Sequence, residues 1–268
     1  MVLVCDNVGA SPVTIPAFDP EAPYVSRLSA RSALYTELRL LLDDHERALK
    51  PEEYRGLVIE ANCLARKSSL TRRKLWTELR SRYRLDLQDP LFKSFWKEWR
   101  RCLSDQERGL TAYVLLALND RLVADLGTEW LFPLLRRAPA ELRVDEVRGF
   151  IVAKSRRGHP EVRNWSEETT LAVAQKYCAS LRDLGLATGT VHKRSVRPAL
   201  YGAPVRLLIH ALRFAGLPLR DIITAPIFRL LAIDSSQVID AFSELNRLGG
   251  LRFRIQGDVI ELDLPEAA

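Results

Sequence analysis

Residues 236–264 of the chain read SQVIDAFSELNRLGGLRFRIQGDVIELDL, and this stretch decides the fold class. Apolar residues in its first half recur at helical spacing, and Gly249-Gly250 then end the helix. Its second half alternates apolar and polar residues on both sides of a turn at Gly257-Asp258, which is typical of a β-hairpin. A helix, a glycine stop and a two-stranded hairpin form the back half of a winged helix-turn-helix unit.

Residues 166–198 repeat this order of elements. Ser166 is a suitable N-cap, and Glu167 and Glu168 in the first turn favour the positive end of the helix dipole. Gly185 ends the helix, and a hairpin centred on Gly189 follows. The sequence therefore predicts two winged units.

Helical spacing of apolar residues also covers most of the chain between Ser26 and Lys154. The predicted helices contain Leu34 to Leu42 (capped by Ser29 or Ser32), Pro51 to Leu64, Ser69 to Tyr83, Phe92 to Leu126 with interruptions, and Val144 to Lys154. The predicted fold class is mainly α, with helical modules, winged helix-turn-helix-like units and short β-hairpins as wings. The predicted divisions are a proline-marked extended arm over 1–22, a helix-turn-helix-like DNA-binding module over 23–105, a middle winged-helix-like module over 106–198 and a C-terminal one over 199–268.

Composition excludes several classes of protein. The chain has 268 residues, which is long enough for it to fold without disulfides. Hydrophobic residues make up 47% of the sequence, a fraction too high for a disordered protein. The cysteines (Cys5, Cys63, Cys102 and Cys178) are too far apart for a zinc knuckle. The longest apolar run, Tyr113 to Leu118, is too short to span a bilayer, and the N-terminus does not resemble a secretory signal. We therefore expect a cytoplasmic protein with no membrane contact.

The 40 Lys and Arg residues exceed the 34 Asp and Glu by 6, and one short span concentrates the excess. Between Arg66 and Arg84 there are eight cationic residues and one acid, Glu78. Apolar residues (Leu75, Trp76, Leu79 and Tyr83) occupy one face of the helix expected here, and most cations lie off that face, as in a recognition helix. Hydroxyls at the helix start can meet a phosphate. The predicted DNA contacts are Arg66, Lys67, Ser68, Ser69, Thr71, Arg72, Arg73, Lys74 and Arg80; the alternative is a solvated charged face.

A second basic set surrounds the helix that Ser166 begins. Lys154, Arg156, Arg157 and Arg163 precede it, and the hairpin after it supplies the remaining predicted DNA contacts, which are His192, Lys193, Arg194 and Arg197. A cationic wing suits the phosphodiester backbone or a minor groove. The alternative is ordinary protein surface, since Glu167 and Glu168 are near.

Catalytic and metal sites are not expected. The four histidines (His45, His159, His192 and His210) form no metal-binding motif, and the chain lacks a phosphate-binding glycine loop and a nucleophile elbow. The five tryptophans lie in or beside apolar helical faces, which favours the core over base stacking. We expect no enzyme activity, no cofactor, no metal and no small-molecule ligand.

Three segments are distinctive in combination: SARSAL at 29–34, NCLARKSSLTRR at 62–73, and NWSEET at 164–169 followed by a helix and LGL at 184–186. Together they resemble the BrxA family of BREX (bacteriophage exclusion) systems. The resemblance covers about residues 25 to 200. It implies a small non-enzymatic component of a bacterial phage-defence operon, working beside a site-specific DNA methyltransferase and associated proteins.

The family resemblance leaves the ligand open. Members have been labelled membrane proteins, which the absence of a spanning segment contradicts, and have been likened to an RNA-binding antitermination factor. The basic helix and wing-like hairpins favour duplex DNA, contacted mainly through phosphates. Two alternatives stay open: a protein–protein adaptor within the defence complex, and an RNA binder.

Overall fold

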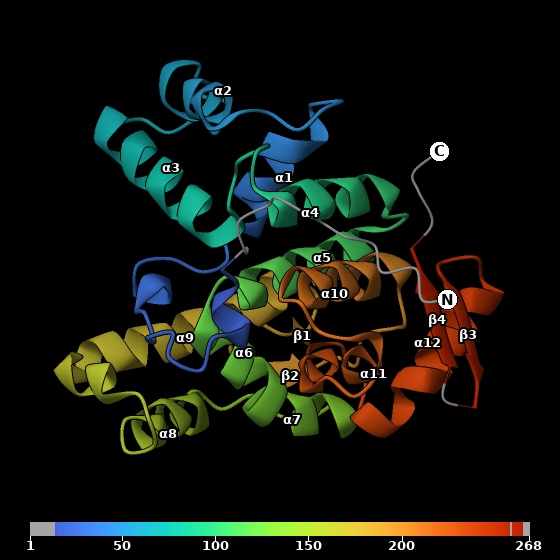
Figure 1. The fold of residues 1–268 in the computed structure, drawn as a ribbon. Helices are drawn as coiled ribbons and strands as arrows, with labels where there is room; N and C mark the ends of the chain where they lie inside the picture. The colour runs from blue at the N-terminus through green and yellow to red at the C-terminus, as the bar shows by residue number, and fades with distance from the viewer. Residues whose placement is uncertain (1–13, 258, 265–268) are drawn as a thin grey trace.

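The computed structural model describes residues 14–257 and 259–264 and confirms a mainly helical fold with short hairpins (Figure 1). The α-helices are α1 (Tyr35–Asp43), α2 (Pro51–Arg55), α3 (Ser69–Tyr83), α4 (Pro90–Arg101), α5 (Asp105–Leu118), α6 (Arg121–Asp125), α7 (Phe132–Arg136), α8 (Val144–Lys154), α9 (Glu167–Asp183), α10 (Gly202–Phe214), α11 (Leu219–Ile222) and α12 (Val238–Arg247). Short 3-10 or π segments are η1 (Pro16–Phe18), η2 (Arg27–Ser29), η3 (Gly56–Glu60), η4 (Leu126–Leu131), η5 (Pro160–Asn164), η6 (Pro226–Leu231) and η7 (Ser235–Gln237). The strands are β1 (Ala187–Thr188), β2 (Arg194–Ser195), β3 (Arg252–Gln256) and β4 (Val259–Asp263).

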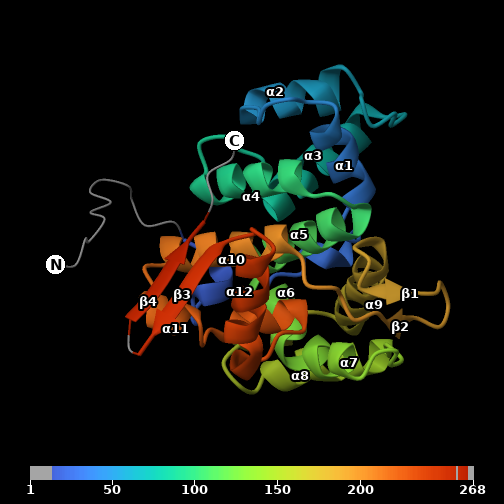
Figure 2. The same ribbon diagram turned by 90° about the vertical axis from the view of Figure 1, so that its right-hand side faces the viewer.

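Helix α5 lies at the centre of the core. All its residues from Gly109 to Leu118 are buried, and α3, α4, α6 and α10 pack against it (Figures 1 and 2). Its burial on all sides follows from its sequence, because apolar residues occupy nearly every position of its second half. Three tryptophans (Trp76, Trp96 and Trp99) are also buried in this core, and the other two are half-buried against it, which confirms their predicted place.

The predicted helix starts and ends are partly confirmed. Helix α3 begins as predicted, with Ser68 as its N-cap. Helix α1 begins only at Tyr35, and the residue before it, Leu34, has a left-handed backbone and provides no capping side chain. The predicted cap by Ser29 or Ser32 is therefore wrong; Ser29 lies in the separate turn η2.

Two predicted helices are shorter or interrupted in the structure. The helix expected over 51–64 is α2 continued as η3, and it ends at Glu60. The helix expected up to Leu126 breaks after α5 at Asn119, and α6 starts again behind Asp120, whose carboxylate caps it. Burial raises the pKa of that carboxyl to about 6.

Both predicted hairpins form. In the β1–β2 hairpin, Ala187 pairs with Ser195 and Thr188 with Arg194. The β3–β4 hairpin is longer and antiparallel from Arg252 to Asp263, as its alternating sequence predicts. Gly185, with a φ of 80°, ends α9 in the left-handed conformation that glycine tolerates best.

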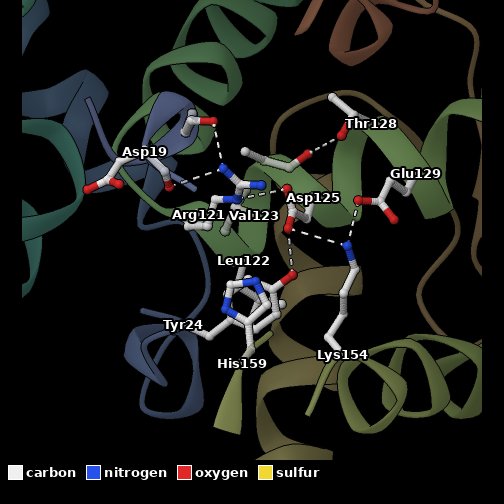
Figure 3. A network of polar contacts seen from close by, with 12 residues as sticks. Asp19, Tyr24, Arg121, Leu122, Val123, Asp125, Thr128, Glu129, Lys154 and His159 are labelled. Carbon is white, nitrogen blue, oxygen red and sulfur yellow. Dashed lines mark hydrogen bonds and ion pairs between the residues drawn. The ribbon is translucent and has the colours of Figure 1, made fainter. Parts of the chain in front are cut away.

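The segment before α1 is tied into the core (Figure 3). The Tyr24 ring stacks on His159 with 3.6 Å between ring centroids, and its hydroxyl donates to Asp125 Oδ2 at 2.6 Å. Its backbone N–H donates to Glu161 Oε1 at 2.6 Å, and Arg121 donates to the carbonyls of Ala17 and Asp19. Of the predicted extended arm, residues 1–13 lie outside the described residues.

Within the described part of the chain, no single helix is long and apolar enough to cross a membrane. The two neighbouring helical segments Leu219–Leu231 and Ser235–Arg247 have the length and apolar composition of a membrane span only when they are counted together, and the chain bends by 109° between them.

Candidate nucleic-acid interface

Helix α3 divides its residues between core and surface as its sequence predicts. It belongs, with α2 and η3, to the upper part of the molecule in Figure 1, and it packs against η3 and α5. Its predicted inner face, which is Leu75, Trp76, Leu79 and Tyr83, is buried. The exposed residues on the helix include Arg73, Lys74 and Arg80.

The start of α3 carries the predicted hydroxyl groups. Ser68 Oγ accepts the backbone N–H of Thr71 at 3.1 Å and lies 2.8 Å from Thr71 Oγ1. This cap fixes the first turn, and Lys67 and Ser69 beside it are exposed. The positive end of the helix dipole therefore opens onto a surface with a nearby ammonium group.

Several cations of this span already have partners inside the protein. Arg66 forms an ion pair with Glu37 at 2.6 Å, and Arg72 donates to the Ile59 carbonyl at 2.6 Å. Arg82 is 2% exposed and donates to the carbonyls of Arg27 and Arg31, so it is a structural residue. Among the described residues, no acidic side chain lies within 4.0 Å of Lys67, Arg73, Lys74 or Arg80. These four present the least compensated charge of the first basic set.

The hairpin residues lie near an acid. Glu141 bridges to Arg194 of β2 through the backbone, and its carboxylate is 4.0 Å from His192 Nδ1. Lys193 Nζ donates to the Thr190 carbonyl at 2.8 Å, while Arg197 is exposed. The second basic set thus presents less net charge than its cation count indicates.

Of the basic residues before α9, one is paired with acids in the interior and three are exposed. Lys154 pairs with Glu129 at 2.6 Å and with Asp125 at 3.5 Å, which commits it to the interior network of Figure 3. Arg156, Arg157 and Arg163 are exposed. Helix α9 itself packs against both α8 and η2, so two of its sides are covered. The structure therefore does not gather the second set into one continuous face on α9.

The C-terminal helix and hairpin carry balanced charges. In the β3–β4 register Arg252 is directly opposite Asp263, and Arg254 is opposite Glu261. On α12, Arg247 pairs with Glu244 at 2.6 Å.

One exposed basic surface was missed by the sequence reasoning. Lys93, Lys97 and Arg100 lie on the outside of α4, opposite its buried aromatic residues. Their spacing of four and three residues, interleaved with apolar positions, was the available signal.

The described residues offer little for metal or nucleophilic chemistry. They contain no group of three or more His, Cys, Asp or Glu side chains that could hold a metal ion. Burial raises the pKa of the Cys102 thiol to about 12 and that of Cys178 to about 11, so both thiols stay protonated near neutral pH. Burial, and then the positive charges of Arg213, Lys97, Arg101 and Arg206, lower the pKa of His210 to about 4.

Comparison with known proteins gives one family. The family model BrxA matches residues 22–211, from the segment before α1 to most of α10, and no curated protein matches the chain. BrxA is not a known enzyme family. The match confirms the predicted resemblance and covers well over half of the chain. The chain therefore belongs to the BrxA family, which makes it a component of BREX phage defence.

Proposed function

We propose that this BREX component is a non-enzymatic DNA-binding protein that contacts duplex DNA mainly through the phosphate backbone, with α3 as its principal contact. The observation that carries the proposal is the outer surface of α3 together with Lys67 just before its N-cap: Lys67, Arg73, Lys74 and Arg80 have no acidic partner among the described residues. Cations without internal partners are available to replace the counterions that surround a phosphate backbone.

The residue types on α3 favour backbone contact over base reading. Arg73 and Arg80 carry planar guanidinium groups that match phosphate oxygens. No Asn or Gln occurs between Ser69 and Tyr83 to read adenine, so any direct readout depends on arginine contacts to guanine. Binding is therefore sequence-tolerant.

The two hairpins support a winged helix-turn-helix interpretation. In each case a helix ends at a left-handed glycine, Gly185 or Gly249, and a two-stranded antiparallel hairpin follows. In the middle unit the hairpin adds a weaker backbone contact through His192, Lys193, Arg194 and Arg197. On this interpretation the modules are 23–105, 106–198 and 199–268.

The family places the protein beside other BREX components, among which we expect the methyltransferase and its associated proteins to be partners. DNA binding would bring the protein to the DNA on which the methyltransferase acts, in the cytoplasm. The competing proposal, a protein–protein adaptor, assigns the basic helix to an acidic protein surface.

A salt series on the purified full-length protein tests the proposal. With a fluorescent random duplex, we expect log K to fall with log salt at a slope of −0.9Z, where the two basic sets, on α3 and around α9, contribute a Z of roughly 4 to 6. A flat salt dependence, or no binding at micromolar protein in low salt, would contradict DNA binding and favour the adaptor. Competition by unlabelled RNA of equal length that exceeds competition by duplex DNA would contradict the choice of DNA.

A further inference from the structure

The second exposed basic surface lies on α4 and α10. On α4 the buried residues face α5 and α10, and Lys93, Lys97 and Arg100 remain on the outside. Arg213, near the end of the neighbouring α10, is also exposed. We call these four residues, Lys93, Lys97, Arg100 and Arg213, the α4–α10 patch.

Acidic charge is scarce in these two helices. Together α4 and α10 contain six Lys and Arg residues and one acid, Glu98. Glu98 is fully buried, where it binds Arg206 at 2.7 Å and Arg101 at 2.9 Å. It therefore serves the interior and does not offset the charge of the patch.

The arrangement of the patch fits an extended anion. Lys93 and Arg100 are seven positions apart, which is about 10 Å along a helix, so the three cations of α4 can contact more than one phosphate of a strand. The Arg213 guanidinium is held by the Leu262 carbonyl of β4. This contact holds Arg213 in place, and the charges of Arg213 and Lys97 both act on His210 of α10, so the two cations lie near the same side chain.

The patch lacks what a protein partner needs. Interfaces between proteins are anchored by buried aromatic or aliphatic side chains at their centre. Among the described residues, none of the exposed large hydrophobic side chains is on α4 or α10; the exposed Leu103 lies beyond the last turn of α4. The surface is cationic and polar, which favours a phosphate backbone over an acidic protein.

We propose that the α4–α10 patch is a second binding surface for a nucleic-acid backbone, in addition to the α3 face; the proposal takes its ligand class from the proposed function. Helices α3 and α10 lie on different sides of α4 in both views, so the two surfaces are distinct (Figures 1 and 2). The protein thus has two contacts for phosphates.

Lysine footprinting of the wild-type protein tests the two surfaces separately. Acetylation with and without a random duplex is quantified by mass spectrometry at Lys67 and Lys74 near α3, at Lys93 and Lys97 in the patch, and at Lys176 on α9 as a reference. We expect duplex DNA to slow acetylation severalfold at the first four lysines and not at Lys176. Protection of Lys67 and Lys74 alone would overturn the inference and leave the proposed function intact. Protection of Lys93 and Lys97 alone would support the inference and contradict the role of α3.

A charge-matched pair of variants gives a second readout. Lys93→Ala/Lys97→Ala/Arg100→Ala should reduce the salt slope by up to about three, because each lost phosphate contact removes about 0.9 from it. The control, Arg247→Ala/Arg252→Ala/Arg254→Ala, removes the same charge from exposed positions that have an acid beside or opposite them. If the two variants have equal slopes and affinities, the patch does not bind nucleic acid, and an acidic protein becomes its better partner.

Discussion

Helix α3 and the β3–β4 hairpin are both rich in arginine, but they present different charge to solvent. In the hairpin, the strand register puts Asp263 opposite Arg252 and Glu261 opposite Arg254. On α3 the lone acid, Glu78, pairs with Arg31 and Arg82 and leaves the outward cations without a carboxylate. The charge available to a ligand therefore depends first on where the acids lie, and only secondarily on the number of cations.

The largest effect is expected at the inner side of α3. Arg82→Ala removes a buried guanidinium and leaves the carbonyls of Arg27 and Arg31 without their donor. Loss of one member of a buried charged network costs about 3–5 kcal/mol of unfolding free energy. Chemical denaturation measures this change in the free energy of unfolding. A decrease of less than about 1 kcal/mol would show that Arg82 belongs with the outward cations.

The next effect concerns the outward cations of α3. Arg73→Ala/Lys74→Ala/Arg80→Ala should weaken duplex binding on the order of 100-fold near 0.1 M salt and reduce the salt slope by up to about three. Thermal unfolding should change little, because exposed substitutions stay within about 0.5 kcal/mol each. We leave Arg72 out of this variant, since its bond to the Ile59 carbonyl joins α3 to η3. Unchanged affinity in a folded variant would remove the distinction drawn between the two regions.

A smaller effect is expected at the β1–β2 hairpin. Lys193→Ala/Arg194→Ala/Arg197→Ala should weaken binding by about 3- to 10-fold and reduce the slope by one to two, because Glu141 lies beside this set. Fluorescence anisotropy with the same duplex measures both quantities. A loss larger than that of the α3 variant would move the principal contact to the middle module.

The smallest effect is expected at the β3–β4 hairpin itself. Arg252→Ala/Arg254→Ala should change affinity by less than about twofold, since each arginine is opposite an acid that already offsets its charge. A slope reduced by two in the same salt series would show that cross-strand acids do not suppress phosphate binding.

Much of the fold could be predicted because its determinants are local. The apolar spacing of Leu75, Trp76, Leu79 and Tyr83 identifies the buried face of α3 before any tertiary contact is known. Glycine stops and the alternation in the β3–β4 hairpin are equally local. The start of α1 could not be predicted this way, because Leu34 takes a left-handed backbone without a capping side chain.

The candidate site was only half predictable. The helical spacing of the apolar residues identifies the cations that lie off the apolar face of α3. It does not show which of those cations pair with other parts of the protein. Arg82 is buried because carbonyls more than 50 positions away in the chain accept its hydrogen bonds. Arg66 stays partly exposed, but Glu37 of α1 pairs with it. The α4 stripe was readable from spacing, whereas the addition of Arg213 depends on how α10 packs against α4.

The docking of Tyr24 has a consequence for the order in which the protein is completed. Its backbone partner, Glu161, is 137 positions further along the chain. At a synthesis rate of about 5–20 residues per second, the Tyr24 segment waits roughly 7 to 27 seconds before that partner is made. Until then Ile15, Tyr24 and Leu28, all buried in the finished protein, have no complete core to enter. The Tyr24 segment is thus synthesised well before the residues that hold it in its native place.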